Sequence, residues 1–379
     1  MTFRSGYGIF WQDYPVGNGA YSIPLNNIPG NTTLLKQQIP DLGYPLTPFL
    51  AEGSHPLPTV VGFDWIKPDT YVQQWNVTSE YAVTNAAVLD IAYIGNHGLN
   101  LQRVLNINLF DPAIGQRPNP NFADINIMGN SGQSIYDALQ VSYRQRLWHG
   151  IQFDLNYTWA HAIDDVEDAG LFAPEPQDNN NFKAERGNGS GDIRHSVSYD
   201  LIYSLPLGEG RPLFGNVKGV AGKSVSGWQI ASLGILHTGI ADTVALGTNT
   251  FGNSDFINQR PNAVAGVDPY AQPQAVNQWL NPAAFSMPAP GTFGNLGRNT
   301  IFGPGLAQID FSVLKDTPIT PGTKLQFRAE IFNLANHPNF AQPNSTFGSP
   351  SFGEIVNTIG RTLGMGTSRQ IQLALRFSF

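Results

Sequence analysis

The chain of 379 residues contains no cysteine, so disulfide frameworks, zinc–thiolate centres and thiol catalysis are excluded. Charged residues are also scarce, at 13% of the sequence, and the formal net charge is −7. Because no strongly basic stretch is available to neutralise phosphates, we expect no nucleic-acid partner. Glycine (40) and proline (28) are abundant but not periodic, which excludes a collagen-like chain.

Long apolar runs are missing as well. No stretch approaches the roughly 20 consecutive apolar residues of a membrane-spanning helix. The N-terminal residues MTFRSGYGIFWQDYP have no charged segment followed by an apolar run and a cleavage site, so no secretory signal is predicted. Aromatic residues nevertheless reach 11%, which argues against a merely disordered chain.

What the sequence does have is an alternation of apolar and polar residues with a period of two. Successive side chains of a β-strand point to opposite faces, so this period predicts strands with one apolar face. Ten segments carry the pattern, each near the length that a tilted strand needs to cross a bilayer. They are residues 4–12, 70–83, 86–95, 134–148, 150–162, 192–205, 225–238, 306–315, 322–333 and 368–379.

The connections between these segments alternate in length. Short ones lie near Thr84–Asn85, Trp148–Gly150 and Asp316–Gly322, and the link at 206–224 belongs with them by order. The long ones cover residues 13–69, 96–133, 163–191, 239–305 and 334–367. Short periplasmic turns that alternate with long external loops are the organisation of outer-membrane barrels. The sequence therefore predicts an all-β fold, an antiparallel transmembrane β-barrel located in the bacterial outer membrane and surrounded by its lipid.

The alternation also predicts which side chains face the lipid and which face the lumen. We expect these residues to point outward: Phe153, Leu155, Tyr157, Leu325, Phe327, Leu373 and Leu375. We expect these to point inward: Asp154, Arg328, Glu330 and Arg376. Charges on the lumen face could pair across strands, or contact a plug or a passing solute. We favour pairing, because opposite charges on neighbouring strands stabilise a sheet by themselves.

Several segments of the chain resemble the TonB-dependent outer-membrane receptors, in particular the Oar-like group with a carboxypeptidase-regulatory-like N-terminal domain. The resemblance covers most of the second half of the chain and is weaker in the first half, where it includes QQWNV (73–77). The segments are DIRHSVSYDLIYSLPLG (192–208), SGWQIASLGILHTG (226–239), WLNPAAF (279–285), GTFGNLGRNTIFGPG (291–305), FRAEIFNLANHPNF (327–340) and the terminal RQIQLALRFSF.

This resemblance implies a 22-stranded type of barrel, closed by an N-terminal plug, with a periplasmic energy-coupling protein as partner. Here about ten strands are predicted and no plug is found. We therefore expect residues 1–379 to be the C-terminal portion of such a barrel domain, with Met1 not the natural start of a working protein. The resemblance also implies an outer-membrane assembly signal, read by the barrel-assembly machinery, at Leu375, Phe377 and Phe379.

Recognisable catalytic chemistry is absent from the sequence: no phosphate loop, HExxH or GxSxG is present. The single SxxK, at Ser312 and Lys315, ends a strand, where positions three apart face opposite ways. The histidines, among them His97, His161, His195 and His237, show no metal-ligand spacing. We therefore predict no catalytic residue, no cofactor and no metal site, and a protein that is not an enzyme.

One acidic cluster is a weaker candidate site. It opens a long external loop with the residues Asp164, Asp165, Glu167 and Asp168. Their carboxylate oxygens suit Ca²⁺, but the spacing fits no calcium-loop template, so a solvated acidic loop is the favoured interpretation.

Two functions remain open from the sequence. The first is a receptor or transporter component for energy-coupled uptake of a scarce solute, which the sequence does not identify. The second is a small structural or adhesive barrel, or a passive porin-like barrel, complete in about ten strands.

Overall fold

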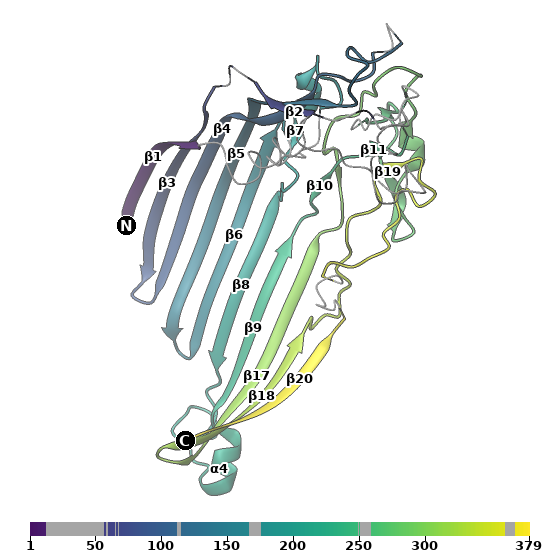
Figure 1. Cartoon of the computed structure of the whole chain (residues 1–379). Coiled ribbons are helices and arrows are strands. Elements are labelled where there is room, and N and C mark those ends of the chain that lie inside the picture. Colours follow the sequence, from purple (N-terminus) through teal and green to yellow (C-terminus); the bar gives the residue numbers. More distant parts are fainter. Residues whose placement is uncertain are drawn as a thin grey trace, which may run out of the picture.

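In the computed structural model, a sheet of long strands forms a curved wall with folded loops at one end (Figure 1). The structure describes residues 1–12, 57, 60–64, 66, 68–111, 115–166, 176–248, 250, 259–360 and 368–379. Among these residues no helix is long and apolar enough to span a membrane. The main chain is instead organised as strands that follow one another in antiparallel order.

All ten predicted strands are present, with ends within a few residues of those expected except at the loop-side ends of two strands and at the turn-side end of β17. They are β1 (Thr2–Gln12), β3 (Thr70–Thr84), β4 (Ala87–Asn106), β5 (Ile125–Trp148), β6 (Ile151–Asp164), β8 (His195–Ser204), β9 (Trp228–His237), β17 (Leu306–Thr320), β18 (Thr323–Phe332) and β20 (Gln370–Ser378). Each pairs with the next in this order. The β2 strand (Val60–Phe63) adds to β5 in parallel, and β7 (Gly187–Asn188) adds to β6.

The sheet is open. Its order begins with β1 and ends with β20, and these two strands are not paired with each other. A sheet edge leaves a row of unpaired backbone N–H and C=O groups, which is costly in lipid. About ten strands of a larger barrel could either leave the sheet unclosed or force its first and last strands to pair. The structure shows the unclosed sheet, with β1 and β20 as its edges.

The strands β4 and β5 are much longer than the alternation predicted. They reach Asn106 and Ile125 rather than ending near residues 95 and 134, with irregular register at Leu99 to Gln102. Beyond the wall, both faces of this hairpin are covered, and polar side chains such as Gln102 and Arg103 are buried there. A strand without one lipid-facing side has no reason to alternate, so the period of two did not reveal it.

The register separates the two faces as expected. Residues opposite each other in a ladder have their side chains on the same face. Leu155 is opposite Tyr143 and Tyr199, whereas Asp154 is opposite Arg144 and Asp200. The same alternation holds across β18 and β20, where Phe327 is opposite Leu375 and Gln326 is opposite Arg376. The seven apolar and four charged side chains predicted to face apart therefore lie on opposite faces.

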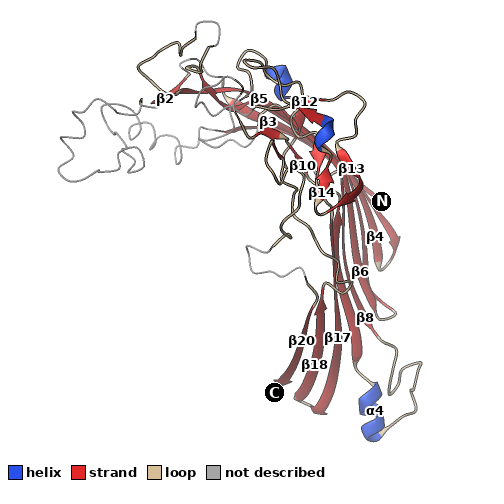
Figure 2. Ribbon diagram, turned by 90° about the vertical axis from the view of Figure 1, so that its right-hand side faces the viewer, coloured by secondary structure: helices blue, strands red, loops and turns tan. Residues whose placement is uncertain are grey.

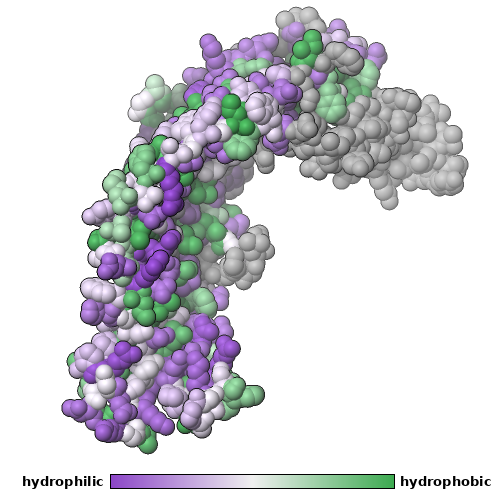
Figure 3. All heavy atoms as spheres, turned by 90° about the vertical axis from the view of Figure 1, so that its left-hand side faces the viewer, coloured by the Kyte–Doolittle hydropathy of each residue, from purple (hydrophilic) through white to green (hydrophobic). Residues whose placement is uncertain are grey.

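The apolar face does not close into a soluble core. Leu373 is 67% exposed and Leu375 is 71% exposed, and none of the seven outward residues is buried. Figure 3, which views the wall from the β1 side, shows hydrophobic and hydrophilic residues intermixed along it. The membrane interpretation of the alternation is consistent with this exposure.

Two aromatic rings cover glycines on the neighbouring strand of the apolar face. Trp75 is opposite Gly95, and Tyr199 is opposite Gly234. A Cβ atom at either glycine would overlap the ring of its partner. The rings thus fill the surface that the missing side chains leave, which compensates for glycine in a strand interior.

Candidate functional site

The connections at one end of the wall form a folded unit that we call the crown (Figure 1, upper part). It comprises the described residues of 107–124, 165–194, 238–305 and 333–369. Its small strands are β10 (Ala241–Asp242), β11 (Ala245–Leu246), β12 (Asn262–Ala263), β13 (Tyr270–Ala275), β14 (Gln278–Leu280), β15 (Phe285–Ser286), β16 (Ile301–Phe302) and β19 (Thr346–Phe347). One pairing, β11 with β19, joins two different connections of the barrel.

The crown has a hydrophobic core of its own. Its buried members are Val244, Leu280, Ala284, Phe285, Ile301 and Phe352, with Phe347 packed against them. The ring of Phe352 stands edge-on to Phe285 and Phe347, at centroid distances of 5.5 and 5.3 Å. These residues come from the β9–β17 and β18–β20 connections, which are therefore packed structure rather than irregular loops.

An ion pair at the centre of the crown is fully buried. Arg260 donates from Nη1 and Nη2 to the two carboxylate oxygens of Glu185, at 2.8 and 3.0 Å. The same guanidinium donates from Nε to the backbone carbonyl of Leu296 at 2.9 Å. Gln177 accepts from the Arg260 backbone N–H at 2.8 Å and donates to the carbonyl of Gly294 at 3.0 Å. This bidentate pair ties the β6–β8 connection to the β9–β17 connection.

Two further arginines fasten the crown to the ends of the wall strands. Arg298 forms an ion pair with Asp164 at the end of β6, and its Nε donates to the backbone carbonyl of Glu185 at 2.8 Å. Burial, and to a smaller extent the positive charge of Arg103, lower the pKa of Arg298 to about 10. Arg103 lies 3.0 Å from the carboxylate of Asp165 and rests over the ring of Phe182.

These contacts locate the predicted acidic site. Asp164 and Asp165 are each paired with an arginine, while Glu167 and Asp168 lie outside the described residues. In the part of the chain that the structure describes, no three histidines, aspartates or glutamates are arranged to hold a metal ion. The acidic site remains a prediction, and the role visible for its first two members is to neutralise buried arginines.

Asparagine side chains add further hydrogen bonds between the β6–β8 and β9–β17 connections. Asn188 donates to the backbone carbonyl of Asn299 at 2.9 Å, and Asn299 returns a hydrogen bond to the carbonyl of Asn188 at 2.7 Å. His161, on β6, lies 3.0 Å from the amide oxygen of Asn188. The sequence shows these residues only as loop asparagines. Their pairing could not be inferred from it, because residues 188 and 299 are 111 positions apart.

Some buried polar groups of the crown have no hydrogen-bond partner among the residues that the structure describes. They include Nη1 of Arg298, Oδ1 of Asn179 and Nε2 of Gln259. Leaving such groups unpaired costs free energy, so they are suited to bind ordered water within the crown.

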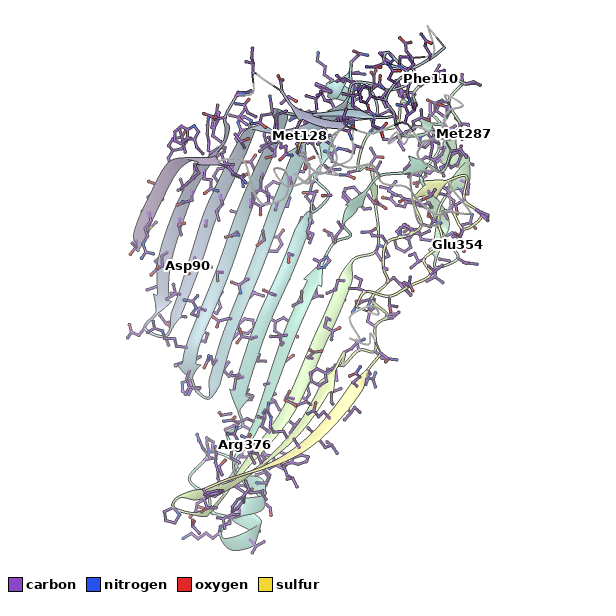
Figure 4. All side chains as sticks on the ribbon, viewed as in Figure 1. Asp90, Phe110, Met128, Met287, Glu354 and Arg376 are labelled. Carbon is purple, nitrogen blue, oxygen red and sulfur yellow. The ribbon has the colours of Figure 1, made fainter. Side chains whose placement is uncertain are left out.

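On the lumen face, oppositely charged neighbours pair as favoured. Arg144 on β5 lies 3.2 Å from Asp154 on β6, and Lys324 on β18 lies 3.4 Å from Asp316 on β17. Arg328 instead donates to Glu330 of its own strand at 2.7 Å. Figure 4 places Asp90 and Arg376 towards opposite ends of the sheet order, on β4 and β20, well below Phe110 and Met287 of the crown. Charge is therefore spread along the wall rather than gathered in one catalytic or metal-binding cluster.

The other residues singled out in the sequence are not brought together. Ser312 is opposite Ala231 and Glu330 on the lumen face, whereas Lys315 is opposite Trp228 and Phe327 on the apolar face. Among the histidines, His195 stacks on Tyr157 with Nδ1 2.9 Å from the phenol oxygen. The terminal residues Leu375, Phe377 and Phe379 are exposed, at 71%, 57% and 98%, and their role as an assembly signal stays a prediction.

A family model described as "Outer membrane beta barrel domain" matches residues 1–372. The chain belongs to this family. Its location is accordingly the bacterial outer membrane, with lipid against the apolar face. The crown is then the external side and the short turns are periplasmic. No curated protein matches the chain at a significant level.

Solved outer-membrane proteins resemble the chain at low identity. The outer membrane transporter YddB from Escherichia coli has a TM-score of 0.46 and 8% identity, over 86% of this chain and 34% of that one. The siderophore receptor PiuA from Acinetobacter baumannii has a TM-score of 0.42 and 10% identity, over 83% and 29%. The ferric-catecholate import receptor Fiu from E. coli K12 has a TM-score of 0.42 and 10% identity, over 100% and 33%.

The chain spans about a third of the length of these solved proteins. Because the TM-scores lie below 0.5, the likenesses carry no argument about what this chain does. What the outer-membrane barrel family establishes is the fold and the membrane.

Proposed function

We propose that the chain is the C-terminal barrel portion of an outer-membrane receptor that takes up a scarce solute with periplasmic energy input. The observation that carries this proposal is an open sheet of ten long strands beneath a crown with its own packed core. A small barrel complete in itself would pair β1 with β20, because unpaired edges are costly in lipid. Edges left open are instead suited to pair with the strands of a larger barrel.

The crown is the proposed solute-binding part. Its connections are held by the buried Arg260–Glu185 pair and by Arg298 with Asp164, so its surface is presented by a preorganised support. Preorganisation lowers the entropy that a binding site loses when it takes its ligand. The plug and the contact with an energy-coupling protein belong to an N-terminal region in this proposal, and the solute is not assigned.

The test is to refold the full chain of 379 residues in lipid vesicles and follow its mobility in SDS gels with and without heating. Closed outer-membrane barrels resist SDS until heated, so a closed eight-stranded barrel refolded in parallel is the control. We expect the chain to unfold in SDS at a lower temperature than the closed control barrel, so that heating changes its gel mobility little. We also expect no selective solute uptake by the vesicles. A monomeric, heat-resistant barrel with selective permeability would overturn the proposal and favour the small porin-like or structural barrel.

A further inference from the structure

The connection between β8 and β9 is unlike the other turns on the periplasmic side. The β5–β6 turn needs only His149 and Gly150, both with positive φ, as a tight hairpin turn requires. Residues 205–227 instead form an extended excursion that includes a short helix, α4 (Gly219–Val225). Figure 2 shows α4 beyond the end of β8, at the opposite end of the wall from the crown.

Hydrogen bonds fix the helix to one particular face of the wall. Lys315 donates from Nζ to the backbone carbonyls of Lys223 and Ser226, both at 2.8 Å. Trp228 donates from Nε1 to the carbonyl of Ser224 at 2.9 Å. Lys315 and Trp228 are opposite each other in the ladder and share the face of Val313 and Ile230. That is the apolar, lipid-facing side, so the end of α4 is attached outside the barrel rather than beneath its lumen.

The excursion exposes apolar and basic side chains together. Leu213 is 53% exposed, Phe214 is 60% exposed and Val220 is 84% exposed. The excursion carries three exposed basic residues, Arg211, Lys218 and Lys223, against one acidic residue, Glu209. None of these basic side chains forms an ion pair with a carboxylate in the described part of the chain. A local excess of positive charge stands out in a chain whose net charge is −7.

We propose that the 205–227 excursion is an interfacial anchor that binds anionic phospholipid headgroups of the periplasmic leaflet. The excursion is held at the end of the lipid-facing side of the sheet and carries apolar residues beside basic ones. An interfacial segment binds a membrane through these two kinds of residue. The apolar side chains enter the boundary between headgroups and acyl chains, and the lysines and arginine attract lipid phosphates. The anchor does not depend on whether the barrel is a receptor or a small porin-like barrel.

The absence of native cysteine allows a single probe to be placed on the excursion. Val220→Cys in the full chain, labelled with an environment-sensitive fluorophore, is refolded in vesicles of phosphatidylcholine with or without phosphatidylglycerol. We expect a blue-shifted emission that headgroup-region spin-labelled lipids quench, with stronger quenching when phosphatidylglycerol is present. The matched control is Gly322→Cys in the β17–β18 turn, where an added Cβ meets open space. Its emission should not depend on phosphatidylglycerol.

Charge reversal separates the anchor from simple proximity to the membrane. Combining Val220→Cys with Lys218→Glu and Lys223→Glu should lower the phosphatidylglycerol-dependent association about tenfold or more, from the attraction expected of basic residues near anionic lipid. The β8 and β9 strands should still form, which circular dichroism of the same sample checks. If the Val220 probe is water-exposed in every vesicle, or is quenched equally with and without the lysines, the anchor does not exist.

Discussion

Arg260 is the largest fully buried side chain in the described part of the chain, and its charge is matched only by Glu185. Removing one member of such a pair leaves the other charged and unpaired in the interior. We expect Arg260→Met to destabilise the crown by about 3–5 kcal/mol, and the double variant with Glu185→Gln to recover much of that loss. Both changes in the free energy of unfolding can be measured by titrating each variant with denaturant in detergent and using proteolytic cleavage of the crown as the readout.

An exposed ion pair on the sheet is the control for the variants of the buried pair. Arg4 lies 3.5 Å from Glu80, with the Arg4 side chain 68% exposed. Such pairs contribute about 0–1 kcal/mol, so Arg4→Met should change stability little. If Arg260→Met and Arg4→Met lowered the free energy of unfolding equally, the central role given to the buried pair would be contradicted.

Asp242 makes a pH dependence of the crown predictable. Burial raises the pKa of its carboxyl group, although hydrogen bonds from Ser345 and the Thr243 backbone act in the opposite direction. In the window between its ordinary pKa and the raised one, the folded state binds more protons than the unfolded state, so stability falls as pH rises. Asp242→Asn should remove this fall and make the crown more stable than the parent at neutral pH. Unfolding curves measured across that pH window check this prediction. If Asp242→Asn is no more stable than the parent there, the raised pKa of Asp242 is disproved.

At the scale of the strand, the alternation assigns neighbouring residues of β6 to lipid and lumen. Leu155 lies on the apolar face, and Asn156 accepts a hydrogen bond from Ser142 on the other face. Arginine on the lipid face near the bilayer midplane costs about 2–4 kcal/mol, whereas the water-filled side accommodates it. We expect Leu155→Arg to reduce folding in vesicles strongly and Asn156→Arg to reduce it little, as measured by folded fraction in denaturant. The reverse order would exchange the two faces.

The last strand carries a prediction about assembly in the cell. Phe377 is exposed on the lipid-facing side of β20, and Phe379, the residue that follows the strand, is exposed as well, as a signal read by the barrel-assembly machinery requires. Removing Phe379 should lower the amount of chain in the outer membrane without changing folding into vesicles in vitro. Ser378→Ala, on the other face of the strand, is the control. If Ser378→Ala lowered the amount of chain in the outer membrane as much as removal of Phe379 does, a specific signal would be contradicted.

For the whole molecule, the open edges give a cross-linking prediction. With no native cysteine, pairs can be introduced freely. Cysteines at Ala329 and Leu373, which are opposite each other on β18 and β20, should join when the refolded chain is oxidised. Cysteines at Gly6 and Ala374, on the two edge strands, should not join within one chain. Efficient intramolecular cross-linking of the edge pair would show that the sheet closes.

The amino-acid sequence by itself determined the strands and their two faces. Each membrane strand needs apolar side chains toward lipid and polar ones toward water, and this need repeats every second residue within the strand. Leu155 and Asp154 were therefore assigned correctly from their immediate neighbours. The outer extension of β4 and β5 escaped detection, because a hairpin covered on both faces has no such alternation.

Only the tertiary structure decided how the crown is held together. Arg260 and Glu185 are 75 positions apart, and Arg298 and Asp164 are 134 positions apart. A buried charge requires a partner of opposite sign, but nothing local in the sequence says which partner it meets, since the folded connections bring them together. The same is true of α4, whose place outside the wall follows from its bonds to Lys315 and Trp228 rather than from its own seven residues.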